Sequence, residues 1–293
     1  MAFPIKRLVV CAAVLLGVAL GASGDTGLVF RTWGGLSNRD LTPMGKVVFE
    51  AGKNWLYAES RDFIYHGQST NGMEWAASEA DYSYDRADIY FGPEDATAKA
   101  HVFVVQEKEL WQKILNKTGC RDSGVAMEMQ GDLFVLVSTN AGIEPGRVPH
   151  EVMHLRIWHK YGGKAPIWLD EGFAAYAGWS IAQAYATAHG RNLTRFLPPI
   201  NPEKRFTVRQ LTSATQYPEG NEELLVFSRQ CNELVEAVAR KLGDGRLGEF
   251  LDAVCGKGAN WRRVLEKRFG YSDRDLRRLD VLVEQGKNMT PEH

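Results

Sequence analysis

The chain has little of several features that mark large classes of protein. Its formal net charge is only −1, which gives no reason to expect nucleic acid or an anionic membrane surface as a partner. No stretch after residue 24 is long and apolar enough to span a bilayer. Cysteine is scarce, at 4 of 293 residues, and no two cysteines have the CxxC spacing of a thiolate zinc site. The remaining composition, 44% hydrophobic and 24% charged, suits a globular protein with a sizeable core.

The first 24 residues have the layout of a secretory signal peptide. A short basic region at residues 6–7 precedes thirteen apolar residues at 8–20, and small residues at 21–24 offer a cleavage site. The apolar run is too short for a spanning helix. A lipoprotein anchor at Cys11 is the alternative, although a bulky residue precedes it and the apolar run continues past it. We therefore expect a secreted, periplasmic or envelope protein with no stable membrane insertion after cleavage.

Removal of the signal peptide leaves three cysteines, Cys120, Cys231 and Cys255. An odd number in an oxidising compartment allows one disulfide and one free thiol. Cys231 and Cys255 fall on successive helical stretches, so a disulfide between them could cross-link a helical hairpin. The alternative is that all three are small core residues. The sequence leaves the pairing open.

The pattern of apolar residues predicts an α+β fold. Residues 25–58 are rich in glycine and aromatic residues, and we expect a small β segment there with a hairpin around residues 51–54. Residues 59–285 are expected to form one domain. Short strands alternate with helices in its first part, ending in a strand at 131–139, and helices dominate from residue 222 onward. A small sheet should therefore precede a mostly helical part.

Two of the seven histidines stand four residues apart in the sequence His150-Glu151-Val152-Met153-His154. On an α-helix, residues at this spacing differ by about 40° around the axis, so both imidazoles can face one cation. Zinc is the usual occupant of such a pair. Glu151, rotated by about 100° from His150, can instead take a proton from a water molecule. This is the chemistry that HExxH supplies in metalloproteases.

A third metal ligand is expected at Glu171, which follows His154 by 17 residues (171 − 154 = 17). The first helix should end at residues 162–163, both glycine, and Pro166 suits the first turn of a new helix. A helix running back would bring the Glu171 carboxylate to the open side of the histidines. This completes a His₂Glu site for one zinc ion per chain. Asp170 could brace a histidine ligand, but an acid at a helix start is also common for its favourable interaction with the helix dipole.

The sequences "HEVMH" and "WLDEGFAAY" together resemble the gluzincin metallopeptidases, most closely the peptidase-MA-like group of bacterial secreted or envelope proteins. The resemblance covers about residues 61–280. It implies that His150, His154 and Glu171 bind zinc and that the general base is Glu151. The implied function is a secreted zinc metallopeptidase acting on a peptide or protein. The alternatives are a non-catalytic zinc-binding or peptide-binding module on the same fold, and a globular domain without metal. The sequence does not indicate an oligomeric state.

Gluzincins also need a donor that stabilises the tetrahedral oxyanion, usually a tyrosine or histidine downstream of the third ligand. The resemblance places it at the start of a helix where this chain has Phe227 and Ser228, and neither residue matches. Tyr217, in a predicted loop, is the nearest candidate, although it could equally be an ordinary turn residue. The missing donor is the reason for keeping the binding-module alternative.

Two upstream segments could contact a substrate. The sequence "GVAMEMQG" at 124–131 is similar to the loop by which aminopeptidases hold a substrate's N-terminus, with Glu128 in the anchoring place. The strand at 131–139 is expected to be an edge strand beside the cleft, where an extended peptide could pair with its backbone.

Overall fold

A computed structural model of the protein describes residues 27–33, 41, 43, 45–46, 48, 55–93, 99–118, 126–129, 131–137, 146–195, 197 and 199–286. The predicted signal peptide at 1–24, the predicted hairpin around residues 51–54 and Cys120 lie outside these ranges. Within them, no helix is long and apolar enough to cross a membrane.

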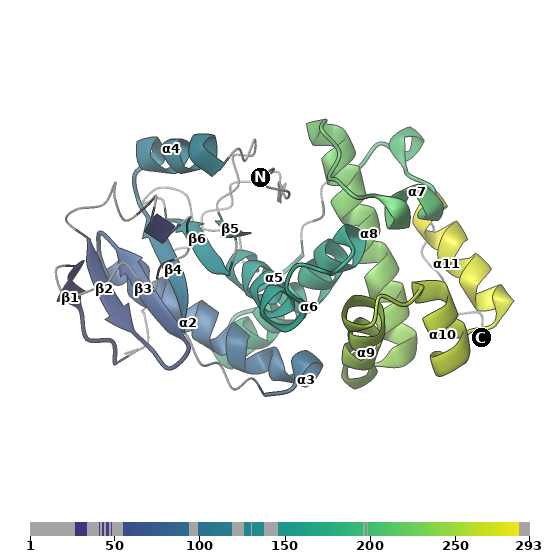
Figure 1. Ribbon diagram of the computed structural model, residues 1–293, viewed down its shortest axis with the longest axis horizontal. Helices are drawn as coiled ribbons and strands as arrows, with labels where there is room; N and C mark the ends of the chain where they lie inside the picture. The colour runs from purple at the N-terminus through teal and green to yellow at the C-terminus, as the bar shows by residue number, and fades with distance from the viewer. Residues whose placement is uncertain are drawn as a thin grey trace.

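In the described residues, a mixed sheet of six strands lies at one side of the molecule in the order β1-β2-β3-β4-β6-β5 (Figure 1). Its strands are β1 (Arg31–Thr32), β2 (Leu56–Glu59), β3 (Phe63–Gly67), β4 (Ala100–Val105), β5 (Ala126–Met129) and β6 (Asp132–Leu136). Strands β3, β4 and β6 run parallel, whereas β1, β2 and β5 are antiparallel to their neighbours. The boundary predicted between residues 58 and 59 falls inside β2, so the N-terminal strands continue the same sheet.

Helices cover the sheet and make up the rest of the described chain (Figure 1). They are α2 (Thr70–Arg86), α3 (Asp88–Phe91), α4 (Lys108–Thr118), α5 (Arg147–Tyr161), α6 (Ile167–Ala188), the 3₁₀ turn η3 (Pro202–Lys204), α7 (Val208–Ser213), α8 (Asn221–Leu242), α9 (Asp244–Leu251), the π-helical turn η4 (Asp252–Gly256), α10 (Trp261–Phe269) and α11 (Asp273–Gln285). The predicted α+β architecture, with a sheet first and helices after it, is confirmed.

Side chains alternate between the two faces of the central strand β4, whose residues are all buried. Val102 and Val104 belong to the larger core, which contains residues of α2, α5 and α6. Phe103 and Val105 belong to a smaller core on the other face, together with Trp111 of α4. The larger core is the one that supports the histidine-bearing helix α5.

The prediction that residues 131–139 form the edge strand is wrong. β6 lies between β4 and β5, and β5 forms the edge. β5 and β6 are a tight antiparallel pair in which Met129 faces Asp132. Because strand order depends on contacts between distant segments, the strong apolar run of β6 gave no sign of a further four-residue strand outside it.

Helices α5 and α6 are joined by a short glycine-containing turn and lie side by side at the centre of the molecule (Figure 1). Gly162 takes a left-handed conformation with φ of 61°, and its N–H bonds to the carbonyl of Trp158. This is a common way for a helix to end at glycine. Pro166 directly precedes the first residue of α6. The predicted helix break and restart are therefore confirmed.

Two glycines allow α6 to pack closely on both of its neighbours. A Cβ atom at Gly178 would lie 2.7 Å from the Cα atom of His150 on α5. A Cβ atom at Gly172 would lie 2.3 Å from the carbonyl oxygen of Cys231 on α8. Both distances are shorter than any normal contact, so the backbones of these helices touch where α6 passes them.

Cys231 and Cys255 are free thiols, both buried. They do not form the disulfide considered from the sequence, and both pack in the larger core. Burial raises the pKa of the Cys255 thiol to about 12, which keeps it protonated and unreactive. The alternative that the cysteines are small core residues is therefore confirmed for Cys231 and Cys255.

Candidate metal centre

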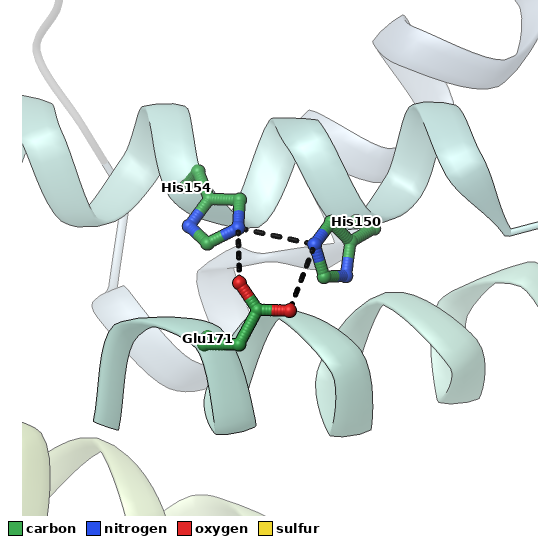
Figure 2. Close-up of side chains that lie close together, drawn as sticks. All are labelled: His150, His154 and Glu171. Atoms are coloured by element: carbon green, nitrogen blue, oxygen red, sulfur yellow. Dashed lines mark hydrogen bonds and ion pairs between the residues drawn. The ribbon is translucent and has the colours of Figure 1, made fainter. Parts of the chain in front are cut away.

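The two histidines of α5 and a glutamate of α6 point at one another across the helix pair (Figure 2). His150 Nε2 lies 3.1 Å from His154 Nε2 and 3.9 Å from Glu171 Oε1, and His154 Nε2 lies 3.8 Å from Glu171 Oε2. Tetrahedral ligands at about 2.0–2.1 Å from an ion are about 3.3 Å apart, so small adjustments would complete a coordination shell. All three side chains are buried, and this buried His-His-Glu group can hold a metal ion.

His154 is held from behind by a carboxylate. Its Nδ1 lies 2.8 Å from Oδ1 of Asp170, and both side chains are about 3% exposed. A hydrogen bond donated by Nδ1 leaves Nε2 free to bind a cation, which is the usual arrangement behind a metal-ligating histidine. Of the two roles considered for Asp170 from the sequence, the structure therefore favours the bracing one.

The two histidines differ in their response to these surroundings. Burial and the neighbouring His154 hold the pKa of His150 well below its usual range. Burial opposes the charge on His154 and is the largest single influence, but the carboxylates of Asp170, Glu151 and Glu171 together outweigh it and raise the pKa of His154 to about 9. A proton in this site therefore goes to His154 first, and a cation has to replace it.

Glu151 is fully buried and is tied to the edge of the sheet. Its Oε2 accepts the backbone N–H of Glu128 on β5 at 2.8 Å. Its Oε1 accepts no hydrogen bond from the described residues. Burial raises the pKa of Glu151 to about 7, against the opposing effects of His154 and Arg147. One carboxylate oxygen is thus fixed by a hydrogen bond, and the other is buried without one.

The Glu128 side chain has a local role. Its Oε1 accepts the backbone N–H of Gly131 at 2.9 Å, across the turn between β5 and β6. The carboxylate is 3% exposed. Glu128 therefore closes the turn with its side chain and positions Glu151 with its backbone.

Tyr217 reaches the ligand group from the segment between α7 and α8. Its hydroxyl lies 3.4 Å from Oε2 of Glu171, to which it can donate a weak hydrogen bond. Its ring packs edge-to-face on Phe227, which is 1% exposed. The nearby hydroxyls of Ser228 and Tyr217 lower the pKa of the Glu171 carboxylate, against the larger effect of burial, which raises it. Tyr217 therefore belongs to the site, and Phe227 is a core residue beneath it.

Arg147 is a member of the site that the sequence reading missed. Its guanidinium is 4% exposed, and burial lowers its pKa to about 10 in spite of the nearby charges of Glu151 and Glu171. The available signal was its spacing, because residues 147 and 151 are four apart on one helix face. Arg147 balances part of the negative charge of the two glutamates.

No protein-family model matches the chain. No curated protein is significantly similar to it in sequence. What the protein does has to follow from the chemistry of this centre.

Proposed function

We propose that the protein is a secreted zinc-dependent metallopeptidase. The observation that carries the proposal is the buried group of His150, His154 and Glu171, with Glu151 beside it on the same helix. Two imidazoles and one carboxylate form a donor set typical of catalytic zinc, which leaves a coordination position for a reactant. The likeness of this motif pair to the gluzincin peptidases supports the same reaction.

Zinc, when bound, would polarise the scissile carbonyl and make water acidic enough to react. Glu151 would accept a proton from the attacking water through Oε1 and pass it to the leaving amine. The N–H of Glu128 keeps the other oxygen in place during both transfers. The Tyr217 hydroxyl, beside Glu171, is the nearest donor for the oxyanion.

An extended peptide would bind along the outer edge of β5. Among the described strands it pairs only with β6, so its second edge faces away from the sheet. Peptides commonly add a strand to such an edge. The edge also carries the N–H that holds Glu151, which would place a paired peptide beside the general base.

The test is cleavage of a mixed peptide library by mature, zinc-loaded protein, with Glu151→Gln beside it. We expect new peptide termini with the wild type and none with the variant, while metal analysis finds one zinc per chain in both. Cleavage retained by the variant would remove Glu151 from the mechanism. Identification of the mature N-terminus after export, expected near residue 24, tests secretion.

The second candidate is a zinc-dependent binding module without catalysis. It is favoured by one observation, that the Tyr217 hydroxyl is directed to Glu171, while α8 has Phe227 and Ser228, about two turns after its start at Asn221, where the resemblance places a tyrosine. Such a protein would bind zinc and peptides but release every peptide uncut. The same library experiment separates it from the peptidase.

A further inference from the structure

A guanidinium without an ion pair to any described residue lies one helical turn beyond Glu171 of α6. Arg195 Nη2 donates to the backbone carbonyl of Ala175 on α6 and to Oδ1 of Asn232 on α8, each at 3.0 Å. Both acceptors are neutral oxygens. Within the described part of the chain, no carboxylate pairs with Arg195. The side chain is half-buried, so it is held in place and still reachable from solvent.

The position of Arg195 relative to the metal centre follows from α6. Ala175 is four residues after Glu171, and four residues make about one turn of helix, or roughly 6 Å along the axis. The preceding residue, Ala174, has a backbone hydrogen bond with His150, and the charge of Arg195 itself acts on His150. Consecutive backbone groups of α6 thus hold a metal ligand and the guanidinium.

An aromatic ring fixes the guanidinium from another side. The Cζ atom of Arg195 lies 5.5 Å from the centre of the Trp179 ring, within the range of a cation–π contact. A Cβ atom built on Gly146, which precedes α5, would lie 3.4 Å from the same ring. Trp179 therefore connects Arg195 to the start of the helix that carries the histidines.

Charges of both signs lie near Arg195, but among the described residues none of the anions pairs with it. Arg229 on α8 lowers the pKa of Arg195 further, after the larger effect of burial. Arg229 pairs with the carboxylate of Glu233, which also pairs with Arg205. Glu236 acts on Arg195 from a distance but pairs with another arginine. The attraction of Glu236 is stronger than the repulsion of Arg229, but Glu233 and Glu236 are each already paired with other arginines.

The contacts of Arg195 with Ala175, Asn232 and Trp179 leave its charge without a carboxylate partner among the described residues. An amide side chain could bridge two neutral oxygens without the cost of partly burying a cation beside another one. A positively charged donor suits a carboxylate, because a charge-assisted hydrogen bond is stronger than one between neutral groups. Ala175 and Asn232 take up both hydrogens of Arg195 Nη2, and the remaining donors on Nε and Nη1 form no bond to the described protein.

We propose that Arg195 binds a carboxylate of the substrate, so that the centre acts on peptides with an acidic side chain or a free C-terminus close to the scissile bond. This inference rests on the proposed peptidase function for its reaction, but the carboxylate site itself is independent of catalysis. A charge-assisted hydrogen bond of this kind favours a carboxylate over its amide by about ten- to a hundredfold.

Four matched peptide pools test the proposal. They carry either Glu or Gln at the randomised positions and either a free or an amidated C-terminus. Cleavage by zinc-loaded wild type and binding to the Glu151→Gln variant are both measured. We expect that one carboxylate-bearing pool is preferred over its amide counterpart by about ten- to a hundredfold. Whether the Glu/Gln pair or the two C-termini show the preference tells which carboxylate is recognised.

Variants then locate the preference. Arg195→Gln should abolish it, and Arg195→Lys, which keeps the charge but changes the position of the donors, should retain part of it. The matched control is Arg191→Gln, because Arg191 is an exposed arginine of the same loop whose guanidinium lies over Tyr185, 5.8 Å from the ring centre. This control should keep the full preference.

The outcomes separate the two proposals. Equal cleavage of all pools by the wild type, a comparison that needs no folded variant, would overturn the carboxylate site and leave the peptidase standing. A preference that survives Arg195→Gln would overturn the assignment to Arg195. If nothing is cut but an Arg195-dependent binding preference remains, the peptidase fails and the carboxylate site stands. Absence of both cleavage and preferential binding overturns both.

Discussion

The spacing between α5 and α6 should control both stability and metal binding, and Gly178→Ala is the change that tests it. The new Cβ atom would lie 2.7 Å from the Cα and 2.8 Å from the N atom of His150. A normal contact is at least about 3.4–3.5 Å, so the helices must separate by roughly 0.7 Å. The clashing atoms are backbone, which cannot turn away as a side chain can.

Two effects of Gly178→Ala oppose each other. Alanine favours a helix over glycine by about 0.5–1 kcal/mol. Inserting a carbon into a tightly packed place costs about 1–3 kcal/mol, and contact with backbone puts this case at the upper end. We therefore expect a net loss of about 1–2 kcal/mol in the free energy of unfolding. A shift of His150 away from Glu171 also exceeds the tolerance of about 0.2 Å for metal–ligand distances, so zinc affinity should fall by roughly tenfold or more.

Denaturant unfolding and zinc titration against a chelating dye measure the two effects. Gly245→Ala is the matched control, because Gly245 lies in helix α9 and a Cβ atom there would meet nothing within 4 Å. The control should be neutral or slightly stabilised and should bind zinc as the wild type does. If Gly178→Ala behaves like Gly245→Ala in both assays, this contact does not set the helix spacing and the reasoning is refuted.

Other perturbations should act through separate groups. Asp170→Asn should weaken zinc binding about 10- to 100-fold in the dye assay, and an unchanged affinity would contradict the bracing of His154. Tyr217→Phe should lower kcat by about 10²–10³ with zinc content unchanged, whereas an unaltered kcat would leave Tyr217 as a turn residue. Zinc removal should lower Tm, and added zinc should restore it. A Tm that does not change with zinc would argue against a bound ion. Burial raises the pKa of Glu79 from 4.5 to about 7, so the folded protein binds the proton more tightly and stability should fall between those pH values. Glu79→Gln should remove that decline of roughly 1–3 kcal/mol between pH 5 and pH 8, measured by denaturant unfolding.

The parts of the site that the sequence predicted are those encoded over short distances. The spacing of His150 and His154 places both on one helix face. Gly162 ends that helix because glycine readily takes the left-handed conformation. The position of Glu171 follows once the second helix runs back. These features depend on helical periodicity and on a turn, so local patterns were sufficient.

The remaining parts depend on contacts between distant segments. β5 lies outside β6 because of sheet order, which no apolar pattern in "AMEM" reveals. Arg195 approaches the centre only because a loop returns over α6 and α8. For Asp170, the same sequence fits a helix-start acid and a histidine brace, and the distance of 2.8 Å to His154 decides between them. Such choices are made by tertiary packing and not by local preference.

The hydrogen bond between Glu151 and the edge of the sheet also bears on how the protein avoids self-association. An open strand edge is a template on which other chains can add and aggregate. β5 has four residues, and the outward N–H of Glu128 is already bonded to a buried carboxylate. At the opposite edge, β1 has two residues. Another copy of the sheet would find a ladder of only a few residues at either edge, too short for stable pairing, whereas a peptide that pairs with part of β5 would also be held at the metal centre.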